Sequence, residues 1–166
     1  MMQVYVPATL AMLRQLVADG SLWPVNGTAF AVTPKLRESY AEGDDDELAE
    51  VALQEAALAS LRLLADDGGE GLPPRRVVIA AAVDGVTLRP DLDDAVVRLT
   101  APVAMDRVVA AYVDNAAAEP AVTAAIAVID AADLGDEDAD LVVGDAQDHD
   151  LAWYANQELP FLLDLL

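Results

Sequence analysis

Residues 75–83 have the sequence Arg75-Arg76-Val77-Val78-Ile79-Ala80-Ala81-Ala82-Val83. The nearly continuous apolar run after the two arginines is typical of a strand that is covered on both faces. We therefore expect residues 77–83 to form an interior strand of a sheet. The rest of the chain must supply the layers that cover it.

The segments on either side of this run predict further strands, helices and loops. Alternating or β-prone stretches predict strands at residues 3–6, 28–33, 95–99 and 108–113. Helical spacing of apolar residues predicts helices at 10–19, 34–40, 44–65 and 121–132, and a C-terminal helix that begins near Asp148 and is broken or kinked at Pro160. Turn-rich composition predicts loops at 66–74 (with Gly68-Gly69-Glu70-Gly71), at 84–94 and at 130–150, and one helical turn at 102–107.

Local signals mark where several of these helices begin and end. Thr9 is expected to cap the helix that Gly20 stops. Thr33 followed by Pro34 is a cap with proline at the first helical position. Asp44 and Glu47 form a variant of the capping box at the start of the longest helix.

The resulting order of elements, βαβααβββαα, predicts one α/β (or α+β) domain that spans residues 1–166. A chain of 166 residues fits a single domain of this kind. We expect a five-stranded mixed sheet packed with helices, with right-handed βαβ crossovers and a helix at the C-terminus.

Acidic residues dominate the charge of the chain. The 30 acids and nine bases give a net charge of −21. Residues 1–107 hold 17 acids and all nine bases, whereas residues 108–166 hold 13 acids and neither Lys nor Arg. A surface of this kind predicts simple solvation, a protein partner with a basic surface, or mimicry of nucleic acid.

The same composition excludes several classes of partner and site. Nucleic acids and anionic membranes would be repelled, and the Arg75-Arg76 pair is too small for a nucleic-acid footprint. No apolar run is long enough to cross a bilayer, and no signal peptide is visible at residues 1–7, so a cytoplasmic protein is expected. Cysteine is absent, and neither a dinucleotide-binding nor a P-loop motif occurs, so we expect no cofactor.

Three segments together resemble an uncharacterised actinobacterial protein family, a domain of unknown function. They are Val4-Tyr5-Val6-Pro7-Ala8-Thr9-Leu10, the block from Ala29 to Glu38 with Phe30, Thr33-Pro34 and Leu36-Arg37, and Asp148-His149-Asp150-Leu151-Ala152-Trp153-Tyr154-Ala155. The resemblance runs nearly from end to end. It implies a cytoplasmic protein from a high-GC genome and assigns no functional residue.

An acidic motif invites comparison with a calcium-binding loop. Asp136, Asp138 and Asp140 have the spacing that opens an EF-hand loop. However, Leu141 stands where glycine permits the sharp turn, and Gln147 stands where the bidentate glutamate is required. We therefore predict no metal site and treat these three aspartates as the candidates should one exist.

The single histidine lies in the most chemically varied segment of the chain. On the expected helix, His149 would face Asp145 one turn earlier and Trp153 one turn later, and we expect Trp153 to pack into the core. A neighbouring carboxylate would orient the imidazole as part of an acid–base unit, for which Glu158 or Tyr154 could supply a second group. Carboxylates here could also hold Mg²⁺ or Mn²⁺.

Two hypotheses for function follow from these observations. The first is a non-enzymatic cytoplasmic binding protein that recognises a basic protein through its acidic C-terminal half, with Trp153, Tyr154 and His149 as binding residues. The second is a small-molecule or metal-dependent enzyme in which His149, Asp145 and Glu158 carry the chemistry. The sequence leaves the partner, the ligand and the oligomeric state open.

Overall fold

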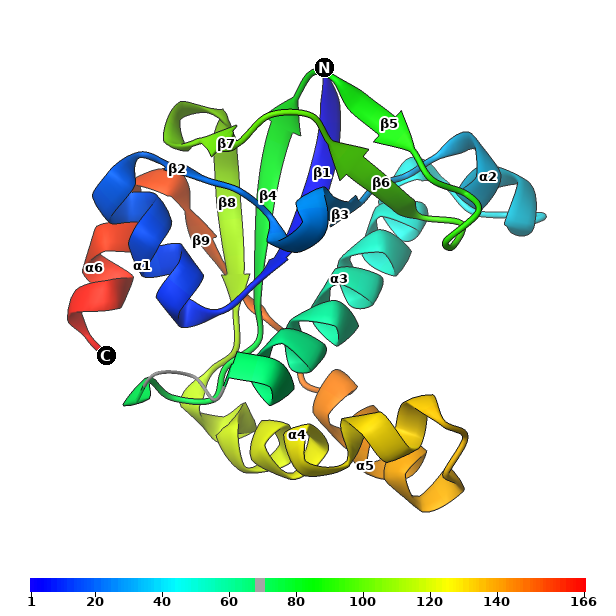
Figure 1. Ribbon diagram of the computed structural model, residues 1–166, viewed down its shortest axis with the longest axis vertical. Coiled ribbons are helices and arrows are strands. Elements are labelled where there is room, and N and C mark those ends of the chain that lie inside the picture. The colour runs from blue at the N-terminus through cyan, green and yellow to red at the C-terminus, as the bar shows by residue number, and fades with distance from the viewer. Residues whose placement is uncertain (68–70) are drawn as a thin grey trace.

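The structure, a computed structural model, describes residues 1–67 and 71–166. Within them, a sheet of seven strands is packed against helices, and two short strands form a separate ribbon (Figure 1). The sheet has the order β5-β6-β3-β1-β4-β8-β9, and each neighbouring pair is antiparallel. The strands span Met2–Ala8 (β1), Ser21–Leu22 (β2), Thr28–Phe30 (β3), Val77–Val83 (β4), Val86–Leu88 (β5), Val96–Leu99 (β6), Val103–Ala104 (β7), Val108–Val113 (β8) and Ala152–Ala155 (β9).

The run that decides the fold is an interior strand, as predicted. β4 pairs with β1 on one side and with β8 on the other, and residues 77–81 are buried. Successive residues alternate between two cores: Val77 and Ile79 belong to the core on one face, and Val78 and Ala80 to the core on the other. Continuous apolar character is therefore explained by cover on both faces.

The prediction of a five-stranded mixed sheet is wrong in two respects. The described residues form seven strands in this sheet, and neighbouring strands are antiparallel throughout. β5 lies in the turn-rich segment where a loop was expected, and β9 lies where a helix was expected. Both are short, so their stability comes from pairing with β6 and β8 rather than from a long local pattern.

Two helices cover the face of the sheet that Val77 and Ile79 share. α1 (Leu10–Asp19) begins at the Thr9 cap, where Thr9 Oγ1 accepts from the N–H of Met12 at 3.2 Å. It ends at Gly20, whose φ of 78° lies in the left-handed region that favours glycine. Both caps are as predicted. The second helix is α6 (Leu159–Asp164), which contributes Leu159 and Leu162 to the same core.

The opposite face is covered in part by α2 (Pro34–Ser39) and α3 (Asp45–Asp67). The predicted caps are confirmed: Thr33 Oγ1 accepts from the N–H of Leu36 at 3.1 Å, and Asp44 Oδ1 accepts from the N–H of Glu47 at 2.9 Å. α3 packs against β1, β3 and β4. Gly68 and Gly69, in the loop expected after this helix, lie outside the described residues.

A helical pair at the C-terminal end of α3 replaces much of the loop expected at 130–150. α4 (Glu119–Asp133) and α5 (Glu137–Gln147) pack against each other and against α3. Ala139, Val143 and Ala146 form the buried stripe of α5. Their spacing is helical, but the four acidic residues among the eleven of this helix had suggested a solvated loop.

The C-terminal segment also differs from the prediction. α5 ends at Gln147, residues 148–151 connect it to β9, and the final helix begins only at Leu159. Pro160 lies in the first turn of α6, where its missing N–H leaves no bond unmade. Pro160 therefore opens a helix instead of breaking one.

Among the described residues, none of the helices combines the length and the apolar character that a bilayer crossing requires.

Candidate binding surface and the buried network beside it

A fully buried ion pair joins the ends of two neighbouring central strands. Arg76 precedes β4 and Asp114 follows β8, and neither side chain is exposed. Arg76 Nε donates to Asp114 Oδ2 at 2.9 Å, and Arg76 Nη2 donates to Asp114 Oδ1 at 2.7 Å. The backbone N–H of Arg76 also donates to Asp114 Oδ2, at 2.8 Å. In this bidentate geometry, the hydrogen bonds best offset the cost of removing the two charges from water.

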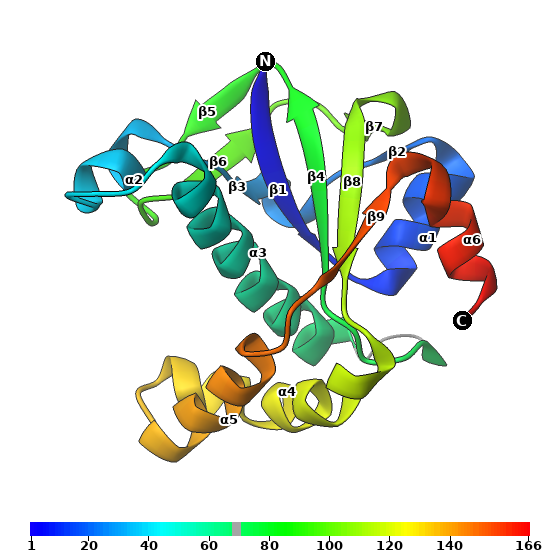
Figure 2. The same cartoon turned by 180° about the vertical axis from the view of Figure 1, so that it is seen from behind.

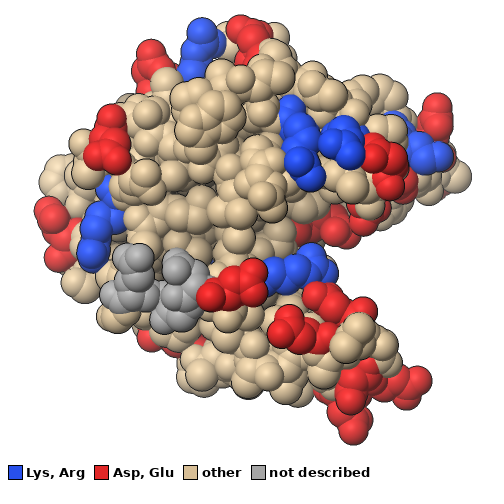
Figure 3. Space-filling model, in the orientation of Figure 1, with Lys and Arg blue, Asp and Glu red and all other residues tan. Residues whose placement is uncertain are grey.

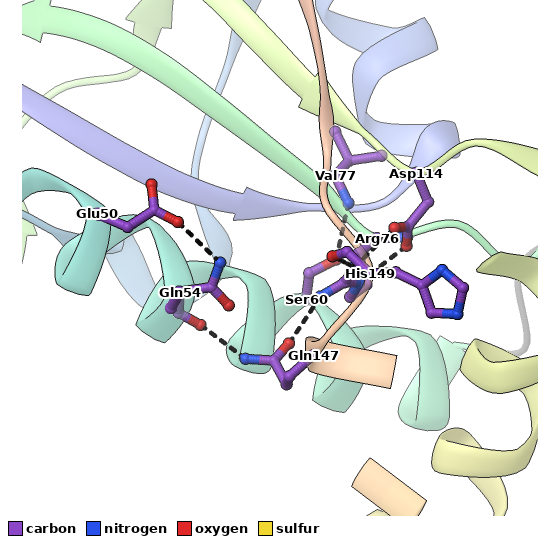
Figure 4. Close-up of polar contacts among 8 residues, drawn as sticks. All are labelled: Glu50, Gln54, Ser60, Arg76, Val77, Asp114, Gln147 and His149. Atoms are coloured by element: carbon purple, nitrogen blue, oxygen red, sulfur yellow. Dashed lines mark hydrogen bonds and ion pairs between the residues drawn. The ribbon is translucent and has the colours of Figure 1, made fainter. Parts of the chain in front are cut away.

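The remaining donors of Arg76 hold the segment that leads to β9 (Figure 4). Nη1 donates to Gln147 Oε1 at 2.9 Å, and Nη2 donates to the backbone oxygen of His149 at 2.8 Å. Gln147 Nε2 in turn donates to the backbone oxygen of Gln54 on α3 at 3.1 Å. The guanidinium group thus fixes the connection between α5 and β9 against the sheet and α3.

Ser60, on α3, completes the β1–β4 ladder beside this pair. Its hydroxyl donates to the backbone oxygen of Ala8 at 2.7 Å and accepts from the N–H of Val77 at 3.0 Å. The hydroxyl therefore stands between two strand residues that are register partners. Since it is buried and already makes both bonds, it serves the structure of the sheet.

These contacts correct the interpretation of Arg75 and Arg76 as a small basic surface patch. Arg76 is buried, and Arg75 Nη2 forms an ion pair with Glu119 Oε2 at 3.0 Å. A sequence signal for the Arg76–Asp114 pair was present. Arg76 comes immediately before one predicted strand, and Asp114 comes immediately after another. When two such strands are antiparallel neighbours, the start of one lies beside the end of the other.

The structure places Asp145 on α5, His149 in the connection between α5 and β9, and Glu158 after β9. The expected helix is absent at 148–155, so Asp145, His149 and Trp153 share no helical face. The imidazole of His149 points away from the Arg76–Asp114 pair, and only its backbone oxygen takes part in the network (Figure 4). Glu158 Oε1 accepts from the N–H of Ala155 at 2.9 Å, which assigns it a role in ending β9.

The three aspartates of the EF-hand comparison lie at the start of α5. Asp136 is its N-cap, and Asp136 Oδ1 accepts from the N–H of Ala139 at 2.9 Å. Asp138 and Asp140 lie in the first turn, where carboxylates favour the positive end of the helix dipole. In the part of the chain that the structure describes, no group of three His, Asp or Glu residues is placed to hold a metal ion.

Trp153 and Tyr154 lie on opposite faces of β9. Tyr154 packs against the core that α1 and α6 cover. Trp153 is 56 % exposed, so the expectation that it packs into the core is wrong. The physical reason is the period of two in a strand, which directs neighbouring side chains to opposite faces of the sheet.

Trp153 belongs to a part of the sheet that α3 leaves uncovered. Its register partner on β8 is Tyr112, whose own partner on β4 is Val78, so Tyr112 and Trp153 share the α3 face. Seen from behind, α3 runs past the β1 side of the sheet, and no described helix lies in front of β8 and β9 (Figure 2). Tyr5, on β1, belongs to the same side of the sheet but is buried in the core beneath α3. We call the surface formed by Tyr112 and Trp153, together with Tyr5 buried beside it, the aromatic face.

The two tyrosines of the aromatic face lie near carboxylates of α3. Burial raises the pKa of the Tyr5 hydroxyl, and the negative charges of Glu50 and Asp46 act in the same direction. Burial and the Glu50 carboxylate likewise raise the pKa of Tyr112. Both hydroxyls therefore remain protonated at neutral pH, and the Tyr5 hydroxyl accepts from Gln3 Nε2 at 3.0 Å.

Sequence reasoning selected Trp153 but missed Tyr5 and Tyr112. Each tyrosine occurs in a predicted strand that is otherwise apolar, which is a weak signal that its hydroxyl requires a polar partner. A cavity of about 360 Å³ adjoins Tyr5 and is also lined by Gln3, Asp45 and Asp46. His149 does not line this cavity.

The acidic side chains are concentrated around the C-terminal helices. On the face shown in Figure 3, Asp and Glu side chains gather over the α4–α5 pair, at the lower right. Residues 108–166, which include β8, α4, α5, β9 and α6, contain neither Lys nor Arg.

Comparison with known proteins identifies the family without an activity. No curated protein and no solved structure matches the chain. One family model matches residues 2–163, which is nearly the whole sequence. The chain therefore belongs to a family of unknown function, DUF6912.

Proposed function

We propose that this protein is a non-enzymatic binding module that recognises a basic polypeptide on the aromatic face. The observation that carries the proposal is the position of Trp153, which is 56 % exposed on an edge strand and lies opposite Tyr112. Tryptophan and tyrosine are enriched at protein interfaces and often dominate their binding energy. Within the aromatic face, Tyr112 and Trp153 offer such side chains on a part of the sheet that α3 does not cover.

The charge around the aromatic face supports a basic partner. Glu50 and Asp46 act on the tyrosine hydroxyls from α3, and Asp148 and Asp150 are exposed just before β9. Lys and Arg side chains would be attracted to these carboxylates and can also stack on aromatic rings. The cytoplasmic location belongs to the same proposal and rests on the sequence.

Selection from a random peptide library displayed on phage tests the proposal. We expect the wild-type protein to enrich peptides rich in Lys and Arg, and Trp153→Ala to weaken their binding by at least about tenfold. Trp23→Ala is the matched control, since Trp23 is 54 % exposed and lies in the segment that joins β2 to β3. Equal effects of the two substitutions, or enrichment of peptides without basic residues, would contradict the proposal.

A further inference from the structure

The outer edge of β9 presents unpaired backbone groups at Trp153. β9 is the last strand in the order of the sheet and pairs only with β8 among the described strands. The N–H of Ala155 donates to Glu158 Oε1, so it does not bond to β8. Because bonding alternates along an antiparallel strand, Ala152 and Tyr154 bond to β8, and the N–H and C=O of Trp153 point outward.

The other side of β8 shows the same alternation. The N–H of Asp114 donates to the backbone oxygen of Arg76 at 3.1 Å, so Asp114 bonds toward β4. Tyr112, two residues earlier, bonds in the same direction, which leaves Ala111 and Val113 to bond β9. Trp153 is opposite Tyr112 and is therefore not part of the β8–β9 ladder.

Apart from its short length of four residues, this edge lacks the features that normally protect exposed strands. Proline, inward-pointing charge and bulges prevent edge strands from pairing with other chains. β9 has the sequence Ala-Trp-Tyr-Ala, which contains neither proline nor a charged residue. The opposite edge strand, β5, is followed at once by Arg89 and Pro90.

The buried network holds this edge in a defined position. Arg76 bonds to the backbone oxygen of His149, three residues before the strand begins, and to Gln147 at the end of α5. Glu158 ends the strand on its other side. An edge fixed at both ends loses little conformational entropy when another strand pairs with it.

We infer that the basic polypeptide binds in an extended conformation and pairs with β9 as an additional strand, an inference that rests on the proposed function. The partner strand bonds to the backbone of Trp153, and alternate side chains of the partner reach the indole ring. Basic side chains at the ends of this strand are attracted to Asp148 and Asp150. A second copy of the chain is disfavoured, since each copy brings 13 acids and no Lys or Arg in residues 108–166.

Synthetic peptides test the inference in the whole 166-residue chain. Trp23→Phe leaves Trp153 as the single tryptophan, so its fluorescence reports directly on the edge. The probes are a peptide of about twelve residues that alternates Lys and Val, the same peptide with its central amide nitrogens methylated, and a Glu–Val counterpart. NMR-detected hydrogen exchange at the Trp153 amide gives a second readout.

We expect the Lys–Val peptide to change Trp153 fluorescence and to slow exchange of the Trp153 amide. The methylated peptide keeps its charge but cannot form the backbone bonds, so its affinity should fall by at least about tenfold. The Glu–Val peptide should not bind. Asp148→Asn/Asp150→Asn should weaken binding more than the charge-matched control Asp19→Asn/Glu42→Gln, whose residues are exposed elsewhere.

Equal binding of the methylated and unmethylated peptides would overturn strand addition while leaving recognition of a basic partner intact. A dimer in which the Trp153 amide is protected without peptide would also overturn it, because the edge would then be occupied by a second copy. If phage selection enriched no basic peptides and Trp153→Ala changed nothing, the proposed function would fall together with the inference.

Discussion

The guanidinium group of Arg76 and the carboxylate of Asp114 are fully buried and are joined by hydrogen bonds of 2.9 and 2.7 Å. Through Arg76, this pair also binds Gln147 and the backbone oxygen of His149. The central strands, α5 and the edge strand β9 are thus tied to one ion pair. Removal of this ion pair should therefore destabilise the central strands, α5 and β9 together.

Asp114→Ala should lower the free energy of unfolding by about 3–5 kcal/mol, because it leaves the buried Arg76 charge without its partner. Urea unfolding followed by circular dichroism measures this. The double variant Arg76→Met/Asp114→Leu removes both charges and should recover part of the loss, because Gln147 Oε1 and the His149 backbone oxygen then lose their donor. A loss below about 1 kcal/mol in Asp114→Ala would show that water or another group compensates Arg76.

Trp153→Ala should cost about 1 kcal/mol or less, since an exposed cross-strand aromatic pair contributes little beyond that. Leu159→Ala is the control within the same segment, and its fully buried side chain predicts a loss of about 2–5 kcal/mol. Thermal or urea unfolding distinguishes the two. A large loss in Trp153→Ala would mean that the indole ring is packed in the core and does not form a binding surface.

Glu55→Gln should stabilise the protein at neutral pH more than at pH 4. Burial raises the pKa of Glu55, with Asp93 acting in the same direction and Arg62 opposing it. The folded protein therefore retains this proton to a higher pH than the unfolded chain, and stability falls as the pH rises between the two pKa values. Gln does not ionise and avoids this loss.

The free energy of unfolding of Glu55→Gln and of the wild type, measured between pH 4 and neutral pH, checks this prediction. Glu50→Gln, on the same helix, controls for a general change in net charge. A stability difference between Glu55→Gln and the wild type that is independent of pH would contradict the assignment to Glu55.

Asp136→Ala should destabilise the protein by about 0.5–2 kcal/mol, because it removes the N-cap of α5. This loss should be the same with and without calcium, since Asp136, Asp138 and Asp140 stabilise the start of a helix. Melting temperatures with EDTA and with low micromolar calcium test both points. A saturable rise of the wild-type melting temperature with calcium would restore the EF-hand hypothesis.

Elements whose signals are local were predicted well from the sequence. Thr9 and Gly20 delimit α1 because a side-chain cap and a left-handed residue act within one helical turn. Thr33-Pro34 likewise marks the start of α2. The apolar run at 77–83 identified the interior strand because burial on both faces requires apolar side chains at every position.

Residues 130–155 were predicted poorly because opposing signals overlap there. Acidic residues obscured the Ala139–Val143–Ala146 stripe of α5, although its spacing is helical. β9 has only four residues, which is too few to distinguish a strand from a helical turn by periodicity. Its conformation depends on pairing with β8, which lies about forty residues earlier in the chain.

The sequence by itself determined the class of the fold, the interior strand, the caps of the early helices and the excess of acid in the C-terminal half. Only the tertiary structure decided that Arg76 is buried and that Trp153 is exposed. A charged side chain can be buried where a partner compensates it, and Asp114, Gln147 and the His149 carbonyl come from distant segments. An aromatic side chain remains at the surface where no helix covers its face of the sheet, and that depends on where α3 packs.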